Sequence, residues 1–270
     1  MHTLANDSLS VSILDPVADR DRFGTRYCTG GYIFQIVDHA RGALLSGPSY
    51  PQWSNAFNGQ GIPDAFNLSP LSEPGSGATV LIAGIGLCDL AKDQVIEFCQ
   101  WEVDQQAGSI TLRTQQAHQS FALELERRVQ LTGRTLRSWT RLRNTGRAFL
   151  PIRWFPHPFF PVTATDELCR FSFPVSLPEN PGFALADNGY VVRKGWPWQD
   201  GHYQAVDLVA PSNLVVLQKH PVLGLVTGTT SYVPSFMPIW GNRCTFSWEP
   251  FMERTVAPGQ ATEWWIDYDF

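Results

Sequence analysis

Two residues in this sequence have the chemistry of a general acid and base, and the first is a histidine held between prolines. His157 lies in RWFPHPFFP, residues 153–161, between Pro156 and Pro158. Among the six histidines, only this one lies in such a rigid apolar frame. Proline fixes its own φ and pushes the preceding residue towards extended geometry, so the direction of the imidazole is restricted. An imidazole with an ordinary pKa of about 6.5 suits proton transfer near neutral pH. The ring could equally be a flat packing surface, and the residues alone leave both interpretations open.

The second residue is Glu249, in the stretch CTFSWEPFMERTVAPGQ. The pattern predicts a strand from Thr245 to Trp248 that delivers this carboxylate, and Pro250 ends that strand. Burial between Trp248 and Phe251 would raise the pKa of the carboxyl towards the range of a general base. The alternative is a carboxylate that accepts backbone hydrogen bonds at a turn.

Other catalytic and binding motifs are absent from the sequence. It contains no G-x-G-x-x-G opening a helix, no P-loop, no G-x-S-x-G and no H-E-x-x-H. The five cysteines are scattered and form no C-x-x-C pair, which argues against a zinc knuckle or a disulfide framework. We therefore expect no metal and no cofactor, and free thiols in a reducing cytoplasm.

The elements that position these residues are expected to be strands. The chain has 22 Gly and 20 Pro, spread throughout, which argues against long helices. Segments rich in β-branched and aromatic residues, bounded by turn formers, predict strands at Leu9 to Leu14, Gly31 to Val37, Gln94 to Val103, Ser109 to Thr114, Phe121 to Leu131 and Thr135 to Arg143. At the C-terminus, alternation in ATEWWIDYDF predicts a further strand with Trp264, Ile266, Tyr268 and Phe270 on one face.

A hairpin is predicted where two of these strands meet. Thr132-Gly133 would form a two-residue turn, in a register that places Glu124 opposite Arg141 and Glu126 opposite Trp139. Such a face of mixed charges is typical of a solvated sheet surface.

These segments indicate one all-β domain spanning residues 1–270, a large antiparallel β-sandwich. The net charge of −5 and pI of about 5.7 give no basic field for nucleic acid or an anionic membrane. No apolar run of 18 residues and no signal peptide are found, so we expect a cytoplasmic protein. Nothing in the sequence predicts an oligomeric state.

The motifs around His157 and Glu249 resemble the aldose 1-epimerase, or galactose mutarotase-like, superfamily. In that family a strand ends in N-x-G, here Asn144-Thr145-Gly146, and an H-P-Y-F type motif follows, here HPFF. The downstream Trp248-Glu249-Pro250 and Val256-Ala257-Pro258-Gly259 resemble its E-P segment, and Val206-Asp207 resembles its D-h segment. The resemblance covers residues 120–270 well and the N-terminal half more thinly.

This resemblance implies a supersandwich fold and a sugar epimerase that interconverts the anomers of an aldose or a hexose phosphate. His157 would be the acid and Glu249 the base, and the two would lie on opposite sides of one C–O unit of the sugar. Arg26 and Asp207 would bind hydroxyls, and Trp240 or Trp248 would offer an apolar face to the ring. The implied partner is a small-molecule sugar, without a cofactor.

One departure from the family opens an alternative. Many mutarotases carry a second histidine in an N-G-x-H-G type loop, whereas the comparable loop here, residues 57–67 (FNGQGIPDAFN), has none. The second hypothesis is therefore a carbohydrate-binding protein of the same fold that does not catalyse a reaction. A glycosidase would need a defined pair of carboxylates, and only one glutamate is well placed.

Overall fold

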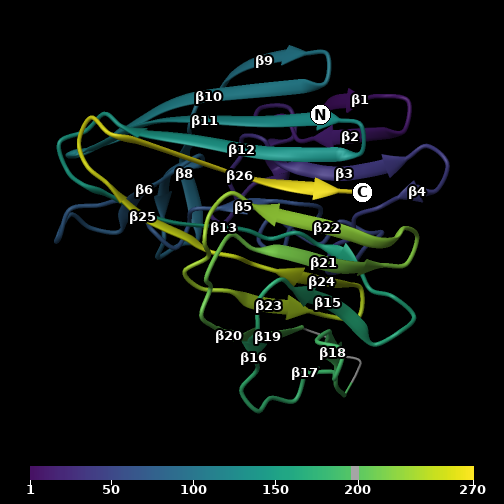
Figure 1. Ribbon diagram of the computed structural model, residues 1–270. Coiled ribbons are helices and arrows are strands. Elements are labelled where there is room, and N and C mark those ends of the chain that lie inside the picture. Colours follow the sequence, from purple (N-terminus) through teal and green to yellow (C-terminus); the bar gives the residue numbers. More distant parts are fainter. Residues whose placement is uncertain (196–200) are drawn as a thin grey trace.

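The computed structural model describes residues 1–195 and 201–270, and in this part of the chain its regular elements are antiparallel strands and one 3-10 turn (Figure 1). Its largest sheet has ten strands in the order β17-β18-β15-β21-β22-β26-β12-β11-β10-β9. Their bounds are β9 Glu102–Gln106, β10 Ser109–His118, β11 Phe121–Thr132, β12 Thr135–Asn144, β15 Glu167–Phe171, β17 Phe183–Leu185, β18 Val191–Arg193, β21 Val215–His220, β22 Gly224–Thr230 and β26 Ala261–Asp269.

Smaller sheets lie against this one. A four-stranded sheet near the N-terminus comprises β1 His2–Ala5, β2 Leu9–Ile13, β3 Ile33–Asp38 and β4 Gly42–Ala43. A second has the order β14-β24-β23-β19, with bounds Phe160–Pro161, Thr245–Trp248, Pro238–Gly241 and His202–Ala205. The three-stranded sheets are β25-β13-β5 (Met252–Val256, Leu150–Pro156, Asp64–Ala65) and β6-β7-β8 (Thr79–Ile82, Gly86–Asp89, Gln94–Phe98). The pair β16 Val175–Ser176 and β20 Asp207–Leu208 and the 3-10 turn η1 Arg20–Arg22 complete the elements.

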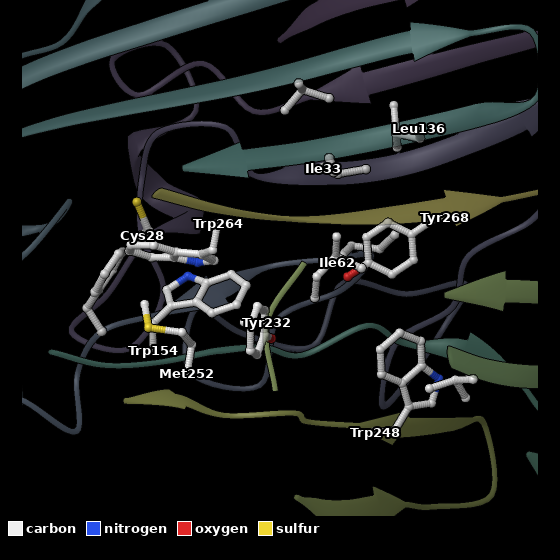
Figure 2. Packing of buried hydrophobic residues seen from close by; sticks show 14 of the residues in the cluster. Cys28, Ile33, Ile62, Leu136, Trp154, Tyr232, Trp248, Met252, Trp264 and Tyr268 are labelled. Atoms are coloured by element: carbon white, nitrogen blue, oxygen red, sulfur yellow. The ribbon is translucent and has the colours of Figure 1, made fainter. Parts of the chain in front are cut away.

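The main core lies between the ten-stranded sheet and the sheets that carry β13 and β24. Trp264 of β26 meets Trp154 of β13 with ring centroids 5.5 Å apart, and Tyr268 of β26 stacks on Trp248 of β24 at 6.0 Å. Figure 2 shows these four rings filling the space between the layers. The alternation predicted for the C-terminal strand is confirmed, since Trp264, Ile266, Tyr268 and Phe270 are all buried. The predicted all-β antiparallel sandwich is thus confirmed.

The predicted strands are found with small shifts, except that residues 94–103 form two strands, β8 and β9, in different sheets. The predicted hairpin register is wrong by two residues. Glu126 lies opposite Arg141, Thr132 pairs with Thr135, and the two-residue turn is Gly133-Arg134. The physical reason is the conformation of Gly133, which has φ +57 and so takes the first turn position, where tight hairpins require a positive φ.

Within the described ranges, 1–195 and 201–270, no helix is long and apolar enough to span a membrane.

Candidate functional site

The segment that carries His157 is an irregular break between β13, which ends at Pro156, and β14, which begins at Phe160. Pro156 and Pro158 have no N–H group, so only alternate residues here need an acceptor for their backbone N–H. The amide of His157 donates to the carbonyl of Pro63 at 2.8 Å, and the amide of Phe159 donates to that of Gly61 at 2.7 Å. The break is therefore held by the 61–63 segment, with every backbone donor satisfied.

Close packing of that segment depends on glycine. Gly61 has φ +80, and a β-carbon there would overlap the carbonyl oxygens of Ile33 and Phe34. Only a residue without a side chain can bring this loop between β3 and the His157 segment. The loop of residues 57–67 thus does lie against the His157 segment.

Glu249 is brought to His157 by the pairing of β14 with β24, in which Phe160 lies opposite Phe246. Continued for three residues, this antiparallel register places His157 opposite Glu249. The two side chains are in direct contact, with Nε2 of His157 3.1 Å from Oε1 of Glu249. The other ring nitrogen, Nδ1, lies 3.0 Å from Oγ of Ser247. Ser247 and Glu249 are two residues apart on one extended segment, so their side chains point to the same side.

Both members of the pair are almost inaccessible, with His157 2% exposed and Glu249 5% exposed. Burial raises the pKa of Glu249 to about 8, against a smaller opposing effect of the Arg26 charge. Burial, helped by Arg26, also lowers the pKa of His157 well below its ordinary value. Both shifts favour uncharged groups, so near neutral pH the pair holds one proton between the carboxyl and the imidazole.

Aromatic rings fix the orientation of the imidazole. Phe159 stacks on it with centroids 4.3 Å apart and planes inclined by 26°. Trp240 of β23 and Tyr27 meet it edge-on, at 6.0 and 6.2 Å. Because the ring is clamped on several sides, its two nitrogens keep their separate partners.

Arg26 is close enough for its charge to act on both members of the pair, and its role in binding a substrate stays a prediction. Its guanidinium lies 5.0 Å from the ring centre of Tyr27 and 4.7 Å from that of Phe57, and Nη1 donates to the carbonyl of Phe57 at 3.2 Å. Among the described residues it has no carboxylate partner. Its donors other than the one bonded to Phe57 are therefore available to an oxygen-rich ligand.

Trp240 is the indole that the structure brings to the pair, and it is half-buried. Trp248 is not brought there, and the proposal that it faces a sugar is not supported. Its side chain is 0% exposed and packs on Phe160. It also stacks on Tyr268 in the core (Figure 2). The reason is strand alternation: Trp248 lies between Ser247 and Glu249 and so points to the opposite face.

Asp207 lies on β20, which pairs with β16 as a separate ladder. It is exposed and, within the described ranges, its side chain has no hydrogen-bond or ion-pair partner. No contact joins it to His157 or Glu249, so its role in binding hydroxyls stays a prediction.

Two further residues at the site were missed by the sequence reasoning. Ser247 could have been found from its spacing of two from Glu249. Tyr203 of β19 lies opposite Trp240, which in turn lies opposite Ser247, so the three side chains share one face of their sheet. Tyr203 is 52% exposed, and its pKa is raised by partial burial and then by the charge of Glu249. No sequence signal indicates this pairing, because it depends on strand order.

A buried ion pair anchors the strand next to His157. Asp64 of β5 lies opposite Pro156, and its carboxylate pairs with Arg127 of β11 in the large sheet. Both side chains are buried, and Thr140 and Ser138 also accept hydrogen bonds from the guanidinium. The pair links the large sheet to the segment that holds the imidazole.

His220 is also buried, contrary to the expectation that only His157 lies in a rigid apolar frame. Its Nε2 lies 2.8 Å from the carbonyl of Leu44, and its Nδ1 accepts from the amides of Val222 and Leu223. Both nitrogens are used by the backbone, which makes it a structural residue. Elsewhere in the described ranges, no three His, Cys, Asp or Glu side chains converge as a metal site would require.

Comparisons with known proteins place this geometry on a known fold. No protein-family model and no curated protein matches the sequence. Solved structures match along nearly the whole chain. A galactose mutarotase related enzyme from Lactobacillus acidophilus is 11% identical with a TM-score of 0.62, covering 99% of this chain and 96% of its own. A galactose mutarotase-like protein from Lactobacillus casei is 13% identical with a TM-score of 0.55, covering 100% and 99%.

A third structure, an aldose epimerase homologue from C. elegans, is 12% identical with a TM-score of 0.52, covering 99% of this chain and 97% of its own. At sequence identities this low, the structural similarity establishes the fold alone. The chain has the galactose mutarotase-like fold, as the resemblance of its motifs predicted.

Proposed function

We propose that this protein interconverts the anomers of a sugar by acid–base ring opening at the His157–Glu249 pair. The observation that carries the proposal is the direct, buried contact between an imidazole and a carboxyl on a galactose mutarotase-like fold. The anomeric hydroxyl and the ring oxygen are bonded to the same carbon. An acid and a base about one hydrogen bond apart can therefore reach both oxygens.

In the proposed reaction, the shared proton first moves from the Glu249 carboxyl to Nε2 of His157, and Glu249 then removes the proton from the anomeric hydroxyl while His157 protonates the ring oxygen. The bond between C1 and the ring oxygen breaks and an aldehyde forms. The sugar rotates about C1–C2, and the two groups exchange roles as the ring closes. No net proton is consumed, which suits a pair that holds one shared proton. Arg26 would bind a hydroxyl or a phosphate group of the substrate, and Trp240 would face the sugar ring.

The test is the relaxation of pure α-glucose, α-galactose and their 6-phosphates, followed by NMR. His157→Ala and Glu249→Gln should each slow the exchange on the order of 10²–10⁴-fold. The matched control is Glu253→Gln, which should keep the wild-type rate. Glu253 of β25 is a half-exposed carboxylate that pairs with Arg153 of β13. Exchange at the buffer rate by the wild type would contradict the proposal for these sugars.

A carbohydrate-binding protein without turnover is the second candidate. It is favoured by the 57–67 loop, which lies against the His157 segment and carries no histidine. Saturable sugar binding, seen by calorimetry, without any acceleration of anomer exchange would support this reading.

A further inference from the structure

We infer that Ser247 is a positioning residue that selects which nitrogen of His157 carries the mobile proton. Its hydroxyl would accept a hydrogen bond from Nδ1–H, so that Nε2 is the nitrogen that exchanges a proton with Glu249 and the sugar. The inference rests on the proposed function, because the direction of proton transfer decides which ring nitrogen keeps its proton, and the tautomer itself can be measured without an activity assay.

The geometry gives each ring nitrogen one partner. Nδ1 lies 3.0 Å from Oγ of Ser247 and Nε2 lies 3.1 Å from Oε1 of Glu249. Ser247 is 0% exposed, and Phe159 stacks on the imidazole ring. The ring therefore cannot turn to exchange its partners without displacing its neighbours.

The chemistry decides the direction of the Ser247 hydrogen bond. A histidine that gives its Nε2 proton to the ring oxygen must be left as a neutral imidazole, and this requires the second proton to stay on Nδ1. A buried Nδ1–H needs an acceptor. A serine hydroxyl can accept, and it lies at hydrogen-bond distance.

A hydroxyl at this position differs from the partner that orients many catalytic histidines. A carboxylate at Nδ1 stabilises the imidazolium, whereas a neutral hydroxyl fixes the tautomer without adding a charge. With Ser247 at Nδ1, Glu249 is the acidic group in contact with the imidazole, and the pair keeps one shared proton. Ser247 and Glu249 both come from β24 and the residue that follows it, so one segment controls both nitrogens.

The experiment is ¹⁵N NMR of the histidine-labelled protein at neutral pH, with the His157 signals assigned by their loss in His157→Gln. In the wild type we expect Nδ1 to show the shift of a protonated nitrogen and Nε2 that of an unprotonated or proton-sharing one. Ser247→Ala should move His157 towards the Nε2–H tautomer, and Ser247→Thr, which keeps the hydroxyl, should restore the wild-type pattern.

In activity, Ser247→Ala should lower kcat at least about tenfold with little change in KM, since the wrong tautomer impairs proton transfer rather than binding. Ser247→Thr should recover most of the rate. An unprotonated Nδ1 in the wild type, or the same tautomer in Ser247→Ala, overturns the inference. The wild-type spectrum decides this even if a variant fails to fold. Absence of anomer exchange in the wild type would instead count against the proposed function and leave the tautomer result unaffected.

Discussion

Nε2 of His157 and Oε1 of Glu249 lie 3.1 Å apart in a site that is almost closed to solvent. The two residues come from distant parts of the sequence and meet through the pairing of β14 with β24. Their contact makes them one proton-sharing unit. The pair titrates as a unit, and its behaviour with pH is the most direct signature of the proposed reaction.

The rate of anomer exchange should fall as the pH rises through about 8. Burial raises the pKa of Glu249 to about 8, so above this pH the pair loses its shared proton and no acid remains for the ring oxygen. The pKa of His157 is lowered, so a second proton should bind, and remove the base, only well below pH 6.5. kcat/KM measured from acidic to alkaline pH should therefore be bell-shaped. A rate that continues to rise above pH 8 would contradict this assignment.

Removing the charge of Arg26 should move the alkaline limb of that profile to higher pH. The guanidinium lowers the pKa of Glu249 in the wild type, so Arg26→Gln leaves the carboxyl protonated to a higher pH. KM should also rise about tenfold or more, because hydrogen bonds to charged groups contribute about 1.5–3 kcal/mol. Arg26→Lys is the matched control, since it keeps the charge and should keep the limb near its wild-type position. An identical limb in all three proteins would show that Arg26 does not act on the pair.

Truncation of Trp248 should mainly lower stability, whereas truncation of Trp240 should mainly weaken sugar binding. Trp248→Ala removes a fully buried core ring and should lower the free energy of unfolding by about 3–5 kcal/mol. Trp240→Ala, at a half-buried ring beside His157, should cost less stability but raise KM for the sugar. Urea unfolding and anomer-exchange kinetics on both variants provide the comparison. Equal KM in Trp240→Ala and the wild type would exclude Trp240 from binding.

Breaking the buried pair of Asp64 and Arg127 should destabilise the fold strongly. Asp64→Asn leaves an uncompensated guanidinium in the core, which costs about 3–5 kcal/mol. Arg153→Met breaks a half-exposed pair with Glu253 and should cost less than about 1 kcal/mol. Urea unfolding measures both variants, and similar small losses in both would show that the buried pair adds no more than a surface one.

The strands were largely predictable because alternation and turn residues are local signals. The C-terminal strand has its predicted buried face, and the two predicted strands of the long hairpin are present as β11 and β12. The hairpin register was not predictable from Thr132-Gly133, since a positive φ at Gly133 makes Gly133-Arg134 the turn. A shift of two residues preserves which side chains face the core, so the hydrophobic pattern could not correct it.

The sequence by itself determined the acid–base candidates, because the prolines around His157 and the strand end at Glu249 are local features of the sequence. The order of the motifs, typical of the galactose mutarotase-like proteins, indicated the same two residues. Only the tertiary structure decided the rest. Strand order placed Tyr203 and Trp240 beside Ser247, alternation turned Trp248 into the core, and Asp207 lies on a separate ladder. The physical reason is that a β-sheet site is assembled by pairing between distant strands. Such pairing depends on the packing of whole layers, which no short stretch of sequence contains.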